Sequence, residues 1–384
     1  MTTAAAEPSR ALSVRGLELG IGGLHLGLVL LATGQVLATL GYLAGSAALV
    51  LGRRYAGASR GVYIGAALVV LTIVTLQFRG ELELSSGYGR VDRLLTRDLR
   101  FLGLSYAFLR SVRALLVPRD LPVGELLRYF FFFPTFFSGP VTEPTPEPAP
   151  VARPTADDLR AGLSRILIGV AYLGAAQLLR PAVPLSTNTT FAYALTHVPA
   201  LGLWLGAFAS GVWLYLDFAG FSEIFIGLAR GFGERVPENF SQPFGAQSLT
   251  DFWQRWHISL GSWLRATIYT PLTKAILPAA GALLTAVTVP VLTMMVCGLW
   301  HGLTASFLLW GLFHGAGLAA HQIWGRAAVP RISPALRETR PYRAFAWLST
   351  QAFVAAGWVL FLPVGPLPLA RRLDMMGALF GGGG

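Results

Sequence analysis

The chain has 384 residues, of which 54% are apolar and only 13% charged, and its mean hydropathy is +0.57. This composition excludes an ordinary soluble globular enzyme and is typical of a protein with many membrane spans. The net charge of +11 comes almost wholly from arginines scattered over short loops between apolar runs. A nucleic-acid-binding protein gathers its basic residues on one face, so that class is excluded too.

Apolar runs recur along most of the chain and predict an all-α, polytopic transmembrane helical bundle. In chain order, we expect spans at Leu17–Gly34, Val36–Leu51, Gly61–Phe78, Phe101–Val117, Leu126–Phe137, Leu163–Leu179, Val198–Phe218, Ala279–Leu299, Leu303–Trp324 and Ala344–Leu362. Several are shorter than the roughly 20 residues that cross a bilayer. We expect these to be tilted, re-entrant or broken, with their backbone satisfied by protein or by a cavity.

The flanks of the first runs indicate location and orientation. Met1–Arg15 is polar and the apolar run after it is long, so we expect a retained span and no cleavable signal peptide. The chain is therefore expected to be a multi-pass protein of the inner (cytoplasmic) cell membrane. Arg53, Arg54 and Arg60 share one short loop, which the positive-inside rule places in the cytoplasm.

A proline-rich stretch divides the chain. Residues 139–158 alternate prolines with small, acidic and polar residues, which predicts an extended or disordered linker outside the bilayer. It separates N-terminal transmembrane helices in residues 1–138 from C-terminal helices in residues 159–384. Every distinctive motif lies in the second part, and neither part has the composition of a soluble domain.

A second polar window, residues 230–274, lies between apolar runs. Within it, Asp251–Trp263 contains tryptophan at a density that suits a membrane interface, where an apolar ring and a polar N–H are both satisfied. On a helix, His257 would face away from Trp263. Periodicity alone therefore favours an interfacial helix that carries His257 on its polar face.

His301 lies between two apolar runs, with Gly298 and Gly302 on either side. Polar groups are costly inside a bilayer, so a histidine there commonly faces a cavity or a partner, and glycines let backbone or ligand approach its ring. A buried imidazole should be neutral near pH 7 and able to act as a general base. The alternative is a structural histidine bonded to a neighbouring helix. No metal site is expected, because neither an H-E-x-x-H pattern nor a nearby carboxylate accompanies His301.

The other histidines carry weaker signals. His314 and His321 are seven residues apart and share a helix face, which predicts packing or interface roles. On a continuous helix, His301 and His314 would not meet easily. We assign no catalytic role to His25 or His197, because their apolar runs contain no other polar residue that could act with them.

Cys297 is the only cysteine, so an intrachain disulfide is impossible. It precedes His301 by four residues, which places thiol and imidazole on one helix face. Such a pair could carry an acyl group covalently. The alternative, which we favour, is a small apolar residue that fills a buried run.

Three segments resemble the membrane-bound O-acyltransferase family, and most closely its bacterial branch of alginate O-acetyltransferases and the teichoic acid D-alanyl transfer membrane protein. They are Phe131–Val141 (FFFPTFFSGPV), Leu216–Leu272 (with DFAGFSEI and SLTDFWQRWHISL) and Gly298–Gly315 (GLWHGLTASFLLWGLFHG). The resemblance covers about Phe101 to Phe380. It implies a helical bundle around a central tunnel, with residues 159–384 as the catalytic core. It also implies that His301 is the active-site histidine and that His257 is the second important histidine of the tunnel.

The resemblance also implies a reaction. A short acyl group, expected to be acetyl, passes from a thioester to a hydroxyl of an extracytoplasmic polysaccharide or other glycan. The donor is expected to be acyl-CoA or an acyl carrier protein on the cytoplasmic side, with no tightly bound cofactor and no metal. Membrane lipid and a soluble acyltransferase are the other expected partners. The substrate-binding residues are expected to be Trp300, Trp256, Asn239, Asp251 and Ser259, with the two tryptophans as walls against water.

Two alternatives stay open at this point. One is D-alanyl transfer from an acyl carrier protein, which uses the same thioester chemistry. The other is a proton-coupled transporter, whose broken helices and midplane histidine would relay protons. No inverted repeat in the sequence supports the transporter.

Overall fold

A computed structural model describes residues 106, 108–116 except 115, 128–144 except 131, 137 and 138, 154–180, 183, 198–362 and 368–381. Within these ranges the chain is helical, as the composition predicted. The elements are α6 (Phe133–Phe136), α7 (Ala156–Leu179), α9 (Ala200–Gly231), η2 (Pro243–Gly245), α10 (Leu249–Arg255), α11 (Ile258–Leu264), η3 (Arg265–Tyr269), α12 (Thr270–His301), α13 (Ala305–Ala327), η4 (Val329–Arg331), α14 (Pro334–Glu338), α15 (Arg340–Phe361) and α16 (Leu369–Leu379).

Four stretches of the described helices are long and apolar enough to cross a bilayer. They are Ala156–Leu179, Ala200–Gly231, Ile258–His301 and Arg340–Phe361. This confirms the predicted all-α membrane bundle. The first three expected spans, the arginine loop at residues 53–60, and His25 and His197 all lie outside the described residues.

The chain divides into two compact units, Met1–Ile166 with Ile224–Pro237, and Leu167–Glu223 with Glu238–Gly384. In the first unit, the buried Arg110 guanidinium donates hydrogen bonds to the carbonyls of Phe130 and Thr135. Arg128 and Glu234 form an ion pair in the same unit. Helix α7 begins at Ala156, where Thr155 and Asp158 cap each other's backbone N–H groups, so the last residues of the expected linker are helical.

The second unit contains both His257 and His301. Its core cluster joins α9, α10, α15 and α16 with the loop before α10. Tyr215 on α9, for example, packs against Phe240, Phe244 and Trp256, with ring centroids 5.3 to 6.3 Å apart. This aromatic core packs against the short helices. The candidate site lies between them.

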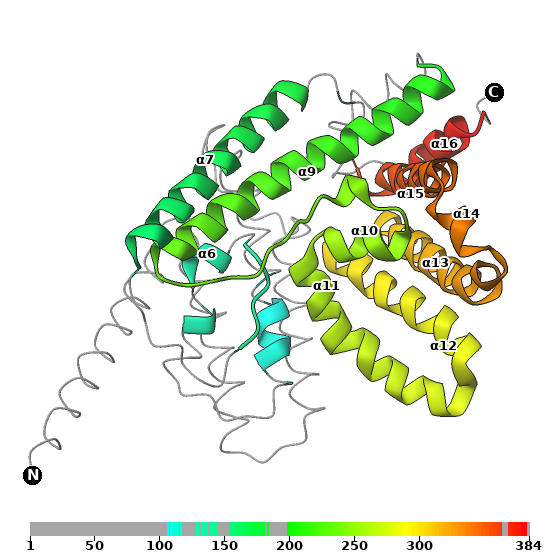
Figure 1. Ribbon diagram of the computed structural model, residues 1–384, viewed down its shortest axis with the longest axis horizontal. Helices are drawn as coiled ribbons and strands as arrows, with labels where there is room; N and C mark the ends of the chain where they lie inside the picture. The colour runs from blue at the N-terminus through cyan, green and yellow to red at the C-terminus, as the bar shows by residue number, and fades with distance from the viewer. Residues whose placement is uncertain are drawn as a thin grey trace, which may run out of the picture. The chain divides into compact units, whose positions relative to one another are not determined.

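Helix α12 is a hairpin of two helical limbs and not one rod (Figure 1). Gly281 breaks it with φ 75° and ψ 175°, a conformation that only glycine adopts without strain. The first limb begins at Thr270 and ends at this break. Pro271 fits there because the first helical positions need no N–H donor, and Pro278 stands just before the break.

The second limb of α12 packs closely against α13. A Cβ at Gly298 would collide with the carbonyl oxygen of Phe307, and a Cβ at Gly311 with that of Met294. Small residues let helix backbones approach in this way inside membranes. Gly298 therefore allows the two helices to pack closely, and this close packing sets the position of His301 along α13.

Arg372 on α16 closes the end of α15. Its Nη1 donates to the carbonyls of Leu360 and Leu362, at 3.1 and 2.8 Å, among the acceptors that the end of a helix leaves without intrahelical partners. Burial lowers the pKa of Arg372. This cation holds the last turn of α15, where Phe361 lies.

Candidate active site

His257 stands at a sharp corner between two short helices. Helix α10 ends at Arg255 and α11 begins at Ile258, and His257 between them has φ 46° and ψ 52°. This left-handed conformation is uncommon for a residue with a side chain and is concentrated at functional sites. Only 4% of His257 is exposed. The sequence pattern suggested one interfacial helix over residues 251–263, and that is wrong, because the corner turns the imidazole inward.

The main chain holds this corner in place. Phe240 and Trp256 form an isolated antiparallel bridge, Ser241 N donates to Arg255 O at 3.0 Å, and Ile258 N donates to Asn239 O at 2.9 Å. Residues 239–241, in the loop before α10, therefore pair through their backbone with residues 255–258. We call this backbone pairing the clasp. Because these bonds use backbone atoms, the corner depends on the clasp and on helix capping more than on any one side chain.

The side chain of Asn239 lies beside the imidazole of His257. Its Oδ1 is 3.3 Å from His257 Nδ1 and accepts a hydrogen bond from Ser259 Oγ at 2.5 Å. Its Nδ2 donates to Ser222 Oγ at 3.0 Å. All four residues are buried, with Asn239 only 1% exposed. A buried polar network satisfied in this way is rigid and specifies one arrangement.

His301 is the last residue of α12 and is partly buried. Aromatic rings from three helices surround it. The ring centroids of Trp300, Trp310, Phe307 and Phe361 lie 4.6, 5.4, 6.0 and 4.8 Å from that of His301. The imidazole therefore sits among apolar rings at a chain break, where water has little access.

Trp300 joins the two histidines. The centroid of its ring lies 4.6 Å from that of His301 and 6.2 Å from that of His257. The two histidines are 44 positions apart in the sequence. Of the residues that the sequence singled out, His257, His301, Trp300, Asn239 and Ser259 therefore come together in the second unit.

Two other predicted substrate-binding residues have different surroundings. Trp256 is 5% exposed and packs in the aromatic core, with Phe252 and Trp358 at 5.5 and 5.0 Å. Asp251 forms an ion pair with Arg255 at 2.6 Å and accepts a bond from Gln247 N. Their described contacts serve the core and the start of α10, and their roles in substrate binding stay predictions.

The remaining described histidines face α10. The ring of His314, which is 1% exposed, lies 5.2 Å from that of Trp253 and 5.0 Å from that of Trp310. His321 Nδ1 lies 3.2 Å from Thr250 Oγ1. The expected shared face is therefore present. Cys297 is buried on α12 in the packed run before His301.

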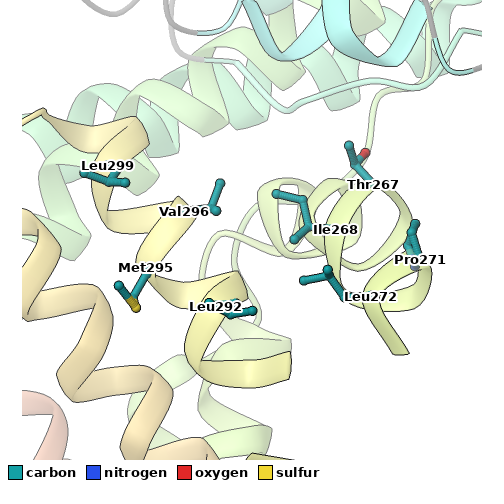
Figure 2. Close-up of a pocket in the computed structure, with 8 residues that line it drawn as sticks. All are labelled: Thr267, Ile268, Pro271, Leu272, Leu292, Met295, Val296 and Leu299. Atoms are coloured by element: carbon teal, nitrogen blue, oxygen red, sulfur yellow. The ribbon is translucent and has the colours of Figure 1, made fainter. Parts of the chain in front are cut away.

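An open apolar cleft lies between the two limbs of the α12 hairpin (Figure 2). Thr267, Ile268, Pro271 and Leu272 line one side, and Leu292, Met295, Val296 and Leu299 line the other. Neither histidine lines it. The cleft is an apolar surface within a stretch long enough to span a membrane, and it offers no group for catalysis.

Sequence reasoning missed three neighbours of the histidines. Ser222 and Phe218 lie four residues apart on α9, where Ser222 contacts Asn239 and the Phe218 ring lies 4.7 Å from that of His257. Phe361 reaches His301 from the end of α15. Ser222 gave no distinct signal, because α9 also carries Asp217 and Glu223, and the aromatic residues look like ordinary core.

Comparison with known proteins identifies the family of the chain. The sequence pattern of the membrane-bound O-acyltransferase family matches residues 62–360. A probable alginate O-acetylase, AlgI, of Pseudomonas aeruginosa is 30% identical over 287 residues, which is 73% of this chain and 52% of the relative. A teichoic acid D-alanyltransferase of Bacillus subtilis is 30% identical over 244 residues, 59% of this chain and 60% of the relative. A peptidoglycan O-acetyltransferase of Helicobacter pylori is 31% identical over 170 residues, 43% of this chain and 30% of the relative.

The chain spans about half the length of the alginate O-acetylases it matches. The match nevertheless contains the whole of both histidine segments, from the loop that carries Asn239 to the start of α13. The chain belongs to the membrane-bound O-acyltransferase family.

Proposed function

We propose that this chain is an integral membrane O-acyltransferase that moves a short acyl group from a thioester donor to a hydroxyl of an extracytoplasmic polysaccharide or other glycan. The pairing of His257 and His301 across Trp300 carries the proposal. Family membership supports acyl transfer as the reaction class. Acetyl is the proposed acyl group, because relatives named as O-acetylases are among the matches.

The proposed chemistry centres on His301. Its neutral imidazole accepts the proton of the acceptor hydroxyl while the hydroxyl oxygen attacks the thioester carbonyl carbon. A C–O bond forms, the C–S bond breaks, and the sulfur leaves as a thiolate that then takes up the proton from His301. A thiol with a pKa of about 8.5 needs little acid help to leave. A well-placed base contributes about 10²- to 10⁴-fold to such a step.

The aromatic surroundings of His301 support transfer over hydrolysis. Rings from α12, α13 and α15 pack around the imidazole, so a water molecule has few ways to reach an acyl group held there. The same exclusion of water strengthens polar interactions with a bound thioester. An enzyme that carries activated acyl groups across a membrane needs this protection.

The donor in this proposal is acyl-CoA or an acyl carrier protein that approaches from the cytoplasm. The chain then needs no tightly bound cofactor, because the thioester already holds the acyl group in activated form. A soluble acyltransferase that completes transfer to the polymer is part of the proposal. The cytoplasmic membrane is the proposed location.

D-alanyl transfer is the second candidate. It is favoured by the similarity to the teichoic acid D-alanyltransferase of Bacillus subtilis, which is as identical to this chain as the Pseudomonas aeruginosa relative. Both reactions place a thioester carbonyl and a hydroxyl before the same imidazole. The mass of the group on the product distinguishes them.

The test uses the full chain in lipid vesicles, with acetyl-CoA or a D-alanyl carrier protein and a purified cell-envelope glycan. We expect release of free thiol that depends on the glycan, and mass spectrometry should show the acyl group on it. In a deletion strain, the envelope glycan should lose the same mass. Thioester that stays intact with both donors, together with an unchanged glycan in the deletion strain, would overturn the proposal.

A further inference from the structure

The side chain of Asn239 stands at the centre of the buried network around His257. It contacts three side chains from three parts of the second unit: Ser222 on α9, His257 at the corner, and Ser259 in the first turn of α11. Asparagine has one acceptor atom and one donor group, which point in different directions. The order of its partners therefore decides which group faces His257.

The amide of Asn239 has one orientation in this structure. Nδ2 donates to Ser222 Oγ at 3.0 Å, so Oδ1 is the atom that faces Ser259 Oγ and His257 Nδ1. An amide oxygen only accepts hydrogen bonds, so the hydrogen in the contact with His257 must be on Nδ1. A neutral imidazole carries a single N–H, which leaves Nε2 as an acceptor.

We infer that Asn239, held by Ser222 and Ser259, is a positioning residue that fixes His257 as its Nδ1–H tautomer. The consequence for catalysis rests on the acyl transfer proposed above. With no hydrogen on Nε2, His257 does not polarise the thioester carbonyl. It instead accepts a hydrogen bond from substrate. The reacting hydroxyl gives its hydrogen to His301, so His257 holds a different O–H or N–H group.

A glycan acceptor supplies such a group from its own structure. Sugars carry several hydroxyls on neighbouring carbons, and a hydrogen bond from one of them to His257 would orient the next toward His301. Asn239 and His257 together therefore position a polyhydroxylated acceptor, while His301 transfers the proton. Loss of Asn239 is expected to affect acceptor binding more than thioester chemistry.

Substitution of the Asn239 side chain should leave the backbone bonds around it in place. Its carbonyl accepts from Ile258 N whatever the side chain is, and the bridge between Phe240 and Trp256 does not use the amide. Asn239→Leu removes the side-chain hydrogen bonds and keeps the branching at Cγ and the number of heavy atoms. Asn239→Asp keeps an acceptor toward Nδ1. Gln351→Leu is the matched control, because Gln351 is a buried amide in the same unit that bonds Ala246 O.

The test is ¹⁵N NMR of the full chain, labelled at histidine and held in lipid bilayers, at a pH where the rings are neutral. The His257 signal is identified by its loss in His257→Asn, since asparagine tolerates the left-handed backbone. We expect the hydrogen on Nδ1 in the parent, in Asn239→Asp and in Gln351→Leu, and on Nε2 in Asn239→Leu. A parent His257 with its hydrogen on Nε2 would overturn the inference.

Kinetics supply the second readout, with acetyl-CoA and the purified glycan as substrates. One lost hydrogen bond to substrate corresponds to about a fivefold effect. We expect Asn239→Leu to raise KM for the glycan about fivefold, with kcat changed less, and Asn239→Asp to recover most of the loss. An unchanged KM in Asn239→Leu overturns the role in acceptor positioning. The tautomer is measured without turnover, so it stands or falls separately from the proposed reaction.

Discussion

The second unit contains two pairs of histidines, and the backbone treats them differently. His257 and His301 stand at the ends of helices, one in a left-handed corner and the other before an extended glycine. His314 and His321 lie on one continuous face of α13, against α10. A helix interior fixes a side chain only against the next helix. A chain break lets loops and several helices converge on one ring, which is what catalysis needs.

The largest expected effect is at His301. His301→Ala should reduce acyl transfer by about 10²- to 10⁴-fold, because the general base is lost. Protein abundance in membranes should stay near that of the parent. Glycan-dependent thiol release from acetyl-CoA, normalised to folded protein, measures the loss.

Cys297→Ala is the control, because the thiol is buried one turn before His301. It should keep activity within a few-fold of the parent. If it abolished turnover and an acyl adduct were trapped on Cys297, direct transfer to the acceptor would be wrong.

The second prediction separates the two pairs. His257→Ala should lower kcat/KM for transfer by about 10- to 100-fold, since the ring is lost beside Trp300 and His301. His314→Ala should leave catalysis by folded protein within a few-fold and lower stability by about 2 kcal/mol, because it leaves a cavity among aromatic rings. Thermal unfolding in nanodiscs and initial rates give the two values. Equal catalytic losses in both variants would erase the distinction between the pairs.

The third prediction tests the packing of α12 on α13, which sets the position of His301 along α13. Gly311→Ala should destabilise the protein by about 1 to 3 kcal/mol, because its Cβ meets the carbonyl of Met294. Gly174→Ala on α7 is the control. Nothing lies within 4 Å of its added Cβ, so stability should rise by up to about 1 kcal/mol. A Gly311→Ala variant as stable as the parent would show that the helices can separate at no cost.

The smallest expected effect is at His321. His321→Ala removes one partly buried contact with Thr250 and should cost about 0.5 to 1.5 kcal/mol of unfolding free energy. Transfer rates should be unchanged. A loss of activity larger than tenfold would show that His321 belongs to the catalytic site and is not only a packing residue.

The sequence could predict the helical membrane class, because hydropathy is a local signal. It also singled out His301 as an ionisable residue in an apolar run, and the catalytic role of that residue stays a prediction. It could not predict the corner at His257. That left-handed conformation depends on a clasp from residues 239–241, far from any local pattern. Periodicity therefore extended one helix through residues 251–263 where the chain has two.

Long-range contacts account for the other differences. The ring of Trp256 packs in the aromatic core, which the sequence did not indicate, while its predicted part in the tunnel wall stays a prediction. Ser222 joins the site only because α9 passes beside the loop with Asn239. The role of Gly298 was also hidden, since the helix that packs on it comes later in the chain.

A double-mutant cycle with His257→Gln and His301→Gln tests most directly whether the two histidines form one site. Transfer rates with acetyl-CoA and the purified glycan are measured for the parent, both single variants and the double variant, each normalised to folded protein. Residues that act on the same transition state are strongly non-additive. The account predicts that the double variant loses little more kcat/KM than the worse single variant. A loss equal to the product of the two single losses would show that His257 and His301 act independently and would contradict the account.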